Sequence, residues 1–175
     1  EAIKWVNYIV AVAFFVCYAY QFFYIAVGLL FKPRKSQKET TLHNYAVLIC
    51  ARNEHAVIRQ LIDSIKSQDY PSDRVTVFVA ADNCTDDTAQ IAREAGAVVY
   101  ERFNREKVGK GYAMNFLLGK IAADYPKDRF DGFFVFDADN VLSPNYITEM
   151  NKTFSQGYET ITSYRNSKNY GDNWI

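Results

Sequence analysis

Residues 45–65 read YAVLICARNEHAVIRQLIDSI, and in this stretch a strand pattern passes directly into a helix pattern. The first six residues are an uninterrupted apolar run, which is typical of a strand buried on both faces of a sheet. Apolar residues then recur at three- and four-residue spacing, which predicts a helix with one apolar face over residues 54–67. Pro71 ends this strand–helix unit.

The same alternation continues along the chain. Further strands are expected over residues 75–80, 97–100 and 133–136, and further helices over residues 85–95, 111–124 and 144–156. Strands and helices that alternate in this way form a mostly parallel sheet with right-handed crossovers, and helices cover both faces. The sequence therefore predicts an α/β fold.

An apolar segment precedes this domain. Residues 5–31 contain no charged side chain. At about 1.5 Å per residue, a helix of this length crosses a hydrocarbon core of about 30 Å. We therefore expect one transmembrane helix over residues 1–32, a linker over residues 33–44 and a separate domain over residues 45–175. The alternative is the buried core helix of a soluble protein, while the length of the run argues against a cleaved signal peptide.

Basic residues follow the apolar run more densely than they precede it. Lys4 stands before the run, whereas Lys32, Arg34, Lys35 and Lys38 come directly after it. Positive charge favours the cytoplasmic side of a membrane, so we expect the following domain on the cytoplasmic face of the cell membrane, with membrane lipid around the helix.

Composition excludes several other classes of protein. The chain has 20 Lys and Arg against 20 Asp and Glu, so nucleic acid is not an expected partner. Its three cysteines, Cys17, Cys50 and Cys84, lie far apart, which argues against a disulfide framework or a zinc site.

Acidic residues stand where three of the expected strands end. Glu54 follows the first strand, Asp82 follows the second, and Asp137 and Asp139 follow the fourth. Ligands of open α/β sheets bind outside the carboxyl ends of the strands, so these acids are expected to converge on one edge. Two carboxylates spaced as in Asp137-Ala138-Asp139 can hold a divalent ion, and that ion can neutralise a diphosphate.

Each of these residues also has a simpler explanation. The Asp137-Ala138-Asp139 motif can be a solvated turn, Asp82 with the asparagine after it can cap a helix, and Glu54 can be a first-turn acid of the next helix. Lys110, between two glycines before a helix, is a candidate for a phosphate contact.

The two histidines, His43 and His55, have no ligand-like spacing in the sequence. We expect both to be isolated and to be either structural or solvated.

Four motifs occur in a fixed order: VLICARNE, VAADNCTDDTAQIA, GKGYAMN and FVFDADNVLSPNYI. In this combination the chain from about residue 45 onward resembles the family 2 glycosyltransferases, which have the Rossmann-like GT-A fold. With the membrane helix before it, the chain is most similar to the integral-membrane members related to the cellulose, hyaluronan and poly-N-acetylglucosamine synthases. The resemblance implies metal-assisted transfer of a sugar from a nucleoside-diphosphate sugar, expected to be a UDP-sugar, to a saccharide or lipid-linked acceptor with inversion.

The resemblance also implies a nucleotide pocket. Ala51 and Glu54 would line the base and ribose, and Asp82 would hydrogen-bond the uracil ring. Arg52 stands where the family commonly has an aromatic residue, and its guanidinium plane can stack on the base or bind phosphate.

On the phosphate side, the resemblance implies that Lys110 approaches the diphosphate. Asp137 would lie by the ribose and the metal, and Asp139 would ligate Mg²⁺ or Mn²⁺. The family's general base belongs to a later motif and is expected beyond Ile175, so no catalytic residue is expected here. Residues 45–175 would be the nucleotide-sugar-binding part of a GT-A domain, incomplete at its C-terminus and inactive in transfer alone. A non-catalytic, membrane-anchored nucleotide-binding or scaffolding subunit is the alternative function.

Overall fold

The computed structural model describes residues 1–31 and 39–164, and the chain divides into two compact units, Glu1–Gln37 and Lys38–Ile175. The first unit holds α1 (Ala2–Leu30), a helix of 29 residues with no buried side chain. This helix is long and apolar enough to cross a membrane, as the sequence predicts. The basic residues after it, on which the predicted orientation depends, lie outside the described residues.

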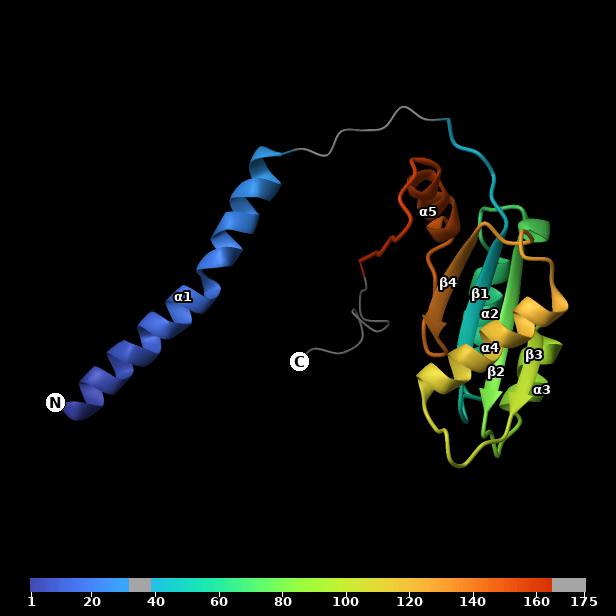
Figure 1. The fold of residues 1–175 in the computed structure, drawn as a ribbon. Coiled ribbons are helices and arrows are strands. Elements are labelled where there is room, and N and C mark those ends of the chain that lie inside the picture. Colours follow the sequence, from blue (N-terminus) through green and yellow to red (C-terminus); the bar gives the residue numbers. More distant parts are fainter. Residues whose placement is uncertain (32–38, 165–175) are drawn as a thin grey trace. The chain divides into compact units, whose positions relative to one another are not determined.

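The second unit is built on a four-stranded sheet in the order β3-β2-β1-β4. All three neighbouring pairs are parallel, so the arrowheads in Figure 1 lie at the same end of the sheet. The predicted parallel α/β sheet is therefore confirmed. Its strands are β1 (Tyr45–Ala51), β2 (Val75–Asp82), β3 (Val98–Arg102) and β4 (Gly132–Asp137).

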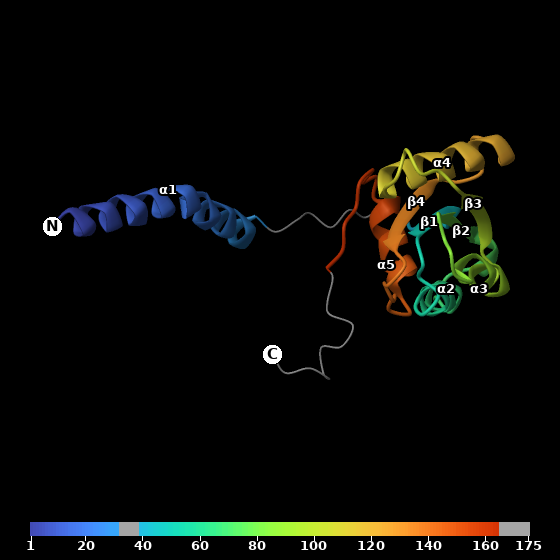
Figure 2. The same ribbon diagram turned by 90° about the horizontal axis from the view of Figure 1, so that it is seen from below.

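Helices cover both faces of this sheet, as expected for parallel strands joined by crossovers (Figure 2). On one face α4 packs against Ala46, Leu48 and Phe78. On the other face the side chains of Val47 and Ile49, which alternate with these along β1, pack under the remaining helices. The helices are α2 (Ile58–Lys66), α3 (Thr88–Glu94), α4 (Lys110–Asp124) and α5 (Tyr146–Ser155), with a 3₁₀ turn η1 (Ser72–Arg74) before β2.

The helices after β1 and β2 begin later than the sequence predicts. Helix α2 starts at Ile58 rather than at residue 54, and α3 starts at Thr88 rather than at residue 85. In both connections an asparagine just after the strand has a left-handed backbone, with φ of 56° at Asn53 and 54° at Asn83. Asparagine tolerates this conformation, which turns the chain away from the sheet before the helix can start.

A buried asparagine on α5 closes the opposite, amino-terminal end of the sheet. Asn151 accepts a hydrogen bond from the Tyr45 hydroxyl through Oδ1 (2.8 Å) and donates one through Nδ2 to the carbonyl of Thr41 (2.8 Å). The segment that leads into β1 is thereby fixed to α5. This network lies at the far end of the strands from the candidate site.

Candidate functional site

The carboxyl ends of the four strands form one edge of the sheet, which we call the carboxyl rim: Ala51, Asp82, Arg102, Asp137 and the segments that follow each of them (Figure 1). The register brings these ends level. Cys50 pairs with Asp137, and Asp82 pairs with Arg102. Three charged residues at this rim, Asp82, Arg102 and Asp137, therefore come from three different strands.

Lys110 reaches this rim from the start of α4. It is the first residue of α4, and the preceding Gly109 has a φ of 131°, a conformation that glycine adopts without a steric penalty. The Lys110 ammonium forms an ion pair with Oδ1 of Asp137, and both side chains remain about half exposed. The GKG loop and the end of β4 thus meet, although 27 residues separate them.

The pKa of the Cys50 thiol is affected by the charged groups at this rim. Burial raises its pKa to about 11; the positive charge of Lys110 opposes this shift, while Asp82 and Asp137 add to it. Charges from three separate elements therefore act on one thiol. The raised pKa keeps the Cys50 thiol protonated at neutral pH.

Asp82 is buried and has an ionic partner. Its Oδ1 accepts a hydrogen bond from Nη1 of Arg102 at 2.5 Å, and the two side chains are only 7% and 9% exposed. The neighbouring Asn83 donates to the same oxygen at 3.1 Å. The helix-cap explanation of Asp82 is wrong, because α3 begins six residues later and Asp86 accepts the backbone N–H of Thr88.

The end of β1 and the residues after it contact the connection between β2 and α3 and the first residue of α3. Ala51 is buried and its carbonyl accepts a weak hydrogen bond from the Cys84 thiol at 3.5 Å, while Arg52 is exposed. The backbone N–H of Glu54 donates to the buried hydroxyl of Thr88 at 2.8 Å. Glu54 precedes α2 by four residues, so it is not a first-turn acid of that helix, and its half-buried side chain lies beside the rim.

The turn after β4 presents the two aspartates of the Asp137-Ala138-Asp139 motif. Asn140 organises this turn: its Oδ1 accepts the backbone N–H of Asp137 at 3.1 Å, and its Nδ2 donates to Oδ1 of Asp139 at 3.3 Å. Ala138 is buried between the aspartates, and Asp139 is exposed. Carboxylate oxygens at an open turn fit the ligand preference of Mg²⁺ and Mn²⁺, so this pair of residues fits a divalent ion.

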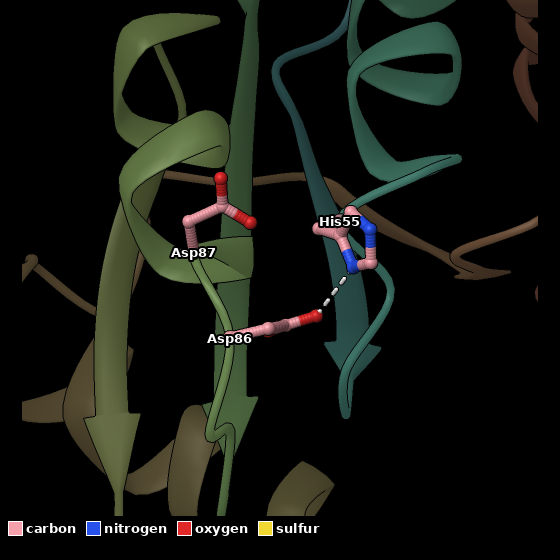
Figure 3. Close-up of side chains that lie close together, drawn as sticks. All are labelled: His55, Asp86 and Asp87. Carbon is pink, nitrogen blue, oxygen red and sulfur yellow. Dashed lines mark hydrogen bonds and ion pairs between the residues drawn. The ribbon is translucent and has the colours of Figure 1, made fainter.

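A separate group of possible metal ligands consists of His55, Asp86 and Asp87 (Figure 3). His55 Nδ1 lies 2.8 Å from Oδ2 of Asp86, so the prediction that His55 is isolated is wrong. Hydrogen bonds from Thr88, and secondarily from His55, lower the pKa of Asp86 to about 2. Asp86 accepts hydrogen bonds from Thr88 through Oδ1 and contacts His55 through Oδ2, so these contacts explain the position of its carboxylate without a metal ion. His43 is structural, with its ring edge-to-face on Phe154 at 4.9 Å.

One residue of the rim, Arg102, was not predicted from the sequence. The third strand was expected over residues 97–100, which leaves Arg102 outside it. In the structure β3 continues through Arg102, since the guanidinium meets the buried Asp82 at the matching position of β2. A charged residue at the end of a short strand was the available signal.

A parallel sheet with acidic and basic side chains from several strands at its carboxyl rim defines an open α/β protein, the class whose ligands bind at that rim. The comparison with protein families is more specific. Residues 43–175 match the model of the family described as "Glycosyltransferase like family 2", and the chain belongs to this family.

Two curated relatives illustrate the range of the family. Over 139 residues the chain is 30% identical to the beta-monoglucosyldiacylglycerol synthase of Nostoc sp. strain PCC 7120, which covers 75% of this chain and 28% of that protein. Over 89 residues it is 39% identical to the 4,4'-diaponeurosporenoate glycosyltransferase of Staphylococcus haemolyticus, covering 49% of this chain and 23% of that protein. The chain spans about a quarter of the length of these relatives.

Among solved structures, the fold is similar to that of the mannosyltransferase PcManGT from Pyrobaculum calidifontis in complex with GDP-Man and Mn²⁺. The TM-score is 0.63 at 23% identity, over 85% of this chain and 42% of that chain. The predicted GT-A, Rossmann-like fold is thereby confirmed. The closer likeness to the cellulose, hyaluronan and poly-N-acetylglucosamine synthases stays a prediction.

Proposed function

We propose that this chain is the donor-binding part of a membrane-anchored glycosyltransferase that transfers a sugar from a UDP-sugar to a saccharide or lipid-linked acceptor. The observation that carries the proposal is the meeting of Lys110 with Asp137 at the same rim as Asp82, in a chain that belongs to family 2. An ammonium group and several carboxylates at one edge suit a ligand that combines a diphosphate, a divalent ion and hydrogen-bonding rings.

The base and ribose are assigned to the ends of β1 and β2. A carboxylate paired with a guanidinium is a hydrogen-bond acceptor, and uracil presents a ring N–H donor, so Asp82 suits the base. Ala51, buried at the end of β1, is assigned to the wall of the base pocket. Arg52 and Glu54 supply an exposed guanidinium and a half-buried carboxylate for the base edge and the ribose hydroxyls.

The phosphates are assigned to the ends of β4 and the start of α4. Asp137 and Asp139 would hold Mg²⁺ or Mn²⁺, and Lys110 would turn from Asp137 to the diphosphate when the nucleotide binds. A bound divalent ion supplies charge stabilisation for the departing nucleoside diphosphate. These residues act on the leaving-group side of the anomeric carbon. A single in-line displacement by the acceptor would invert the anomeric configuration, and its base is not among the residues assigned here.

The acceptor and the location of the enzyme rest on different observations. Helix α1 supports attachment to a membrane, and the basic residues that follow it in the sequence support a cytoplasmic position of the second unit. The two relatives described above are named for a diacylglycerol lipid and for diaponeurosporenoate. Both names favour a lipid-linked or membrane-dissolved acceptor over a free saccharide.

The test is calorimetric titration of UDP into the detergent-solubilised chain with and without Mn²⁺. We expect Mn²⁺ to strengthen UDP binding in the wild-type chain and to have no such effect in Asp139→Asn. Asp63→Asn, an exposed aspartate on α2 away from the rim, is the matched control and should behave as wild type. Metal-dependent affinity that survives Asp139→Asn would refute the assignment.

A further inference from the structure

Arg102 holds an unusual position within the described residues of the second unit. Asp82 and Arg102 are the two ionic side chains that are buried in the described part of the chain, and they are paired with each other. A buried charge that loses its partner is strongly destabilising, so each of these residues depends on the other. The pair joins the ends of β2 and β3.

Arg102 also makes a second contact, in a different direction. Its Nη1 donates to Oδ1 of Asp82 at 2.5 Å, and its Nη2 donates to the carbonyl of Lys107 at 2.6 Å. The guanidinium is planar and carries its donors in a fixed fork, so the two contacts are made in one geometry. Lys107 lies three residues before Lys110, in the segment that leads from β3 to α4.

Two asparagines complete the attachment of this segment. Asn83 accepts the backbone N–H of Asn104 at 2.8 Å and donates to its carbonyl at 3.1 Å. Asn104 in turn accepts the backbone N–H groups of Glu106 (3.0 Å) and Lys107 (2.7 Å) through its Oδ1. Residues 104–107 are therefore tied to the ends of β2 and β3, although all of them except Asn104 are exposed.

From these contacts we infer that Arg102 is a positioning residue that couples the two halves of the donor site. It holds Asp82 on the base side, and through Lys107 it fixes the segment that delivers Lys110 to the phosphate side. The inference rests on the proposed function of the rim. It adds that the base and phosphate contacts are not independent, because one guanidinium holds both.

The substitution Arg102→Lys distinguishes the positioning role of Arg102 from a purely structural role. Lysine keeps a positive charge beside Asp82, but its single nitrogen lacks the planar fork that contacts Asp82 and Lys107 together. Asn104→Ala removes the turn within residues 103–109 and leaves the buried ion pair intact. Both variants should therefore loosen the segment that carries Lys110 while Asp82 keeps a cationic partner.

The experiment measures the affinities of UDP and of uridine for the detergent-solubilised chain in Mn²⁺. We expect Arg102→Lys and Asn104→Ala to weaken UDP by roughly tenfold or more, as for a lost hydrogen bond to a charged group, and uridine by less than about threefold. Arg93→Met is the matched control, since Arg93 pairs with the exposed Glu101 next to Arg102 and its loss should change neither affinity. Thermal unfolding of each variant shows that the fold is retained.

A double-mutant cycle tests the coupling itself. Lys110→Met should weaken UDP strongly in the wild-type chain and by less than about threefold in the Arg102→Lys and Asn104→Ala backgrounds, because Lys110 is no longer held in place there. The inference would be overturned if the losses of UDP affinity in Lys110→Met and in the second variant multiplied in full in the double variant. It would also be overturned if Arg102→Lys and Asn104→Ala weakened UDP and uridine equally. Either result would leave the proposed function intact. A wild-type chain that binds no UDP would overturn the proposed function, and the coupling with it.

Discussion

Replacing Lys110 with methionine should have opposite effects on two ligands. The Lys110 ammonium contacts Oδ1 of Asp137, a carboxylate that we assign to the divalent ion. In the absence of nucleotide, the ammonium and Mn²⁺ therefore compete for the same carboxylate. In its presence, the ammonium has the diphosphate as an alternative partner. Lys110→Met should thus strengthen Mn²⁺ binding alone and weaken UDP binding.

The exposure of the pair sets the size of the first effect. Lys110 and Asp137 are 52% and 45% exposed, so solvent screens their attraction. Pairs of this kind are worth about 0.2–1 kcal/mol, which corresponds to Mn²⁺ binding that is tighter by roughly 1.4-fold to fivefold. The second effect is larger, because a hydrogen bond to a charged group contributes about 1.5–3 kcal/mol, and UDP should weaken by roughly 13-fold to 160-fold.

Both affinities can be measured on one preparation, with Mn²⁺ followed by its electron paramagnetic resonance signal and UDP by calorimetry. Lys110→Arg keeps the positive charge and should stay close to wild type for Mn²⁺. The thermal unfolding curve of Lys110→Met should match that of wild type, since the side chain is half exposed. If Mn²⁺ and UDP affinities fell together, or if neither changed, Lys110 would have no place between the metal and the diphosphate.

Three further predictions concern stability and the membrane. Asn151→Ala should lower the free energy of unfolding by roughly 1–3 kcal/mol in urea titrations, because it leaves the buried Tyr45 hydroxyl without its acceptor. In a Tyr45→Phe background, Asn151→Ala should lower the free energy of unfolding by less. The pKa of Asp86 is about 2 in the folded chain against an ordinary 3.8, so its charge stabilises the fold above about pH 4 and ceases to do so as the pH falls toward 2. The stability difference between wild type and Asp86→Asn should therefore vanish over that range, and a difference that is constant from pH 7 to pH 2 would contradict the assignment. The whole chain should float with phosphatidylcholine vesicles, and deletion of residues 1–31 should abolish flotation and improve solubility in plain buffer; flotation that survives the deletion would rule out α1 as the anchor.

The sheet and its order of elements were predictable because they depend on local patterns. The apolar run of β1 and the helical spacing of α2 are complete within residues 45–65, and each identifies its element without reference to the rest of the chain. The start of α2 was less predictable. Residues 54–57 fit the helical spacing, but the left-handed backbone of Asn53 and the turn after it delay the helix to Ile58.

The location of the site was predictable for the same reason, since the ends of parallel strands share one edge. Its contacts were not, because they depend on which strand ends are neighbours. Arg102 meets Asp82 only through the register of β2 with β3. His55 meets Asp86 across 31 positions in the sequence, because the connections after β1 and β2 lie side by side. A sequence pattern records the residue types at these positions and not the pairing between them.

The most direct test of the central claim is to locate the metal and the nucleotide in crystals of the chain grown with UDP and Mn²⁺. Anomalous diffraction identifies manganese without reference to the assignment of any residue. We expect the manganese peak beside Asp137 and Asp139, with the uracil ring at Asp82 and the diphosphate within reach of Lys110. A manganese peak at His55, Asp86 and Asp87 instead, or UDP bound away from the carboxyl rim, would contradict the account.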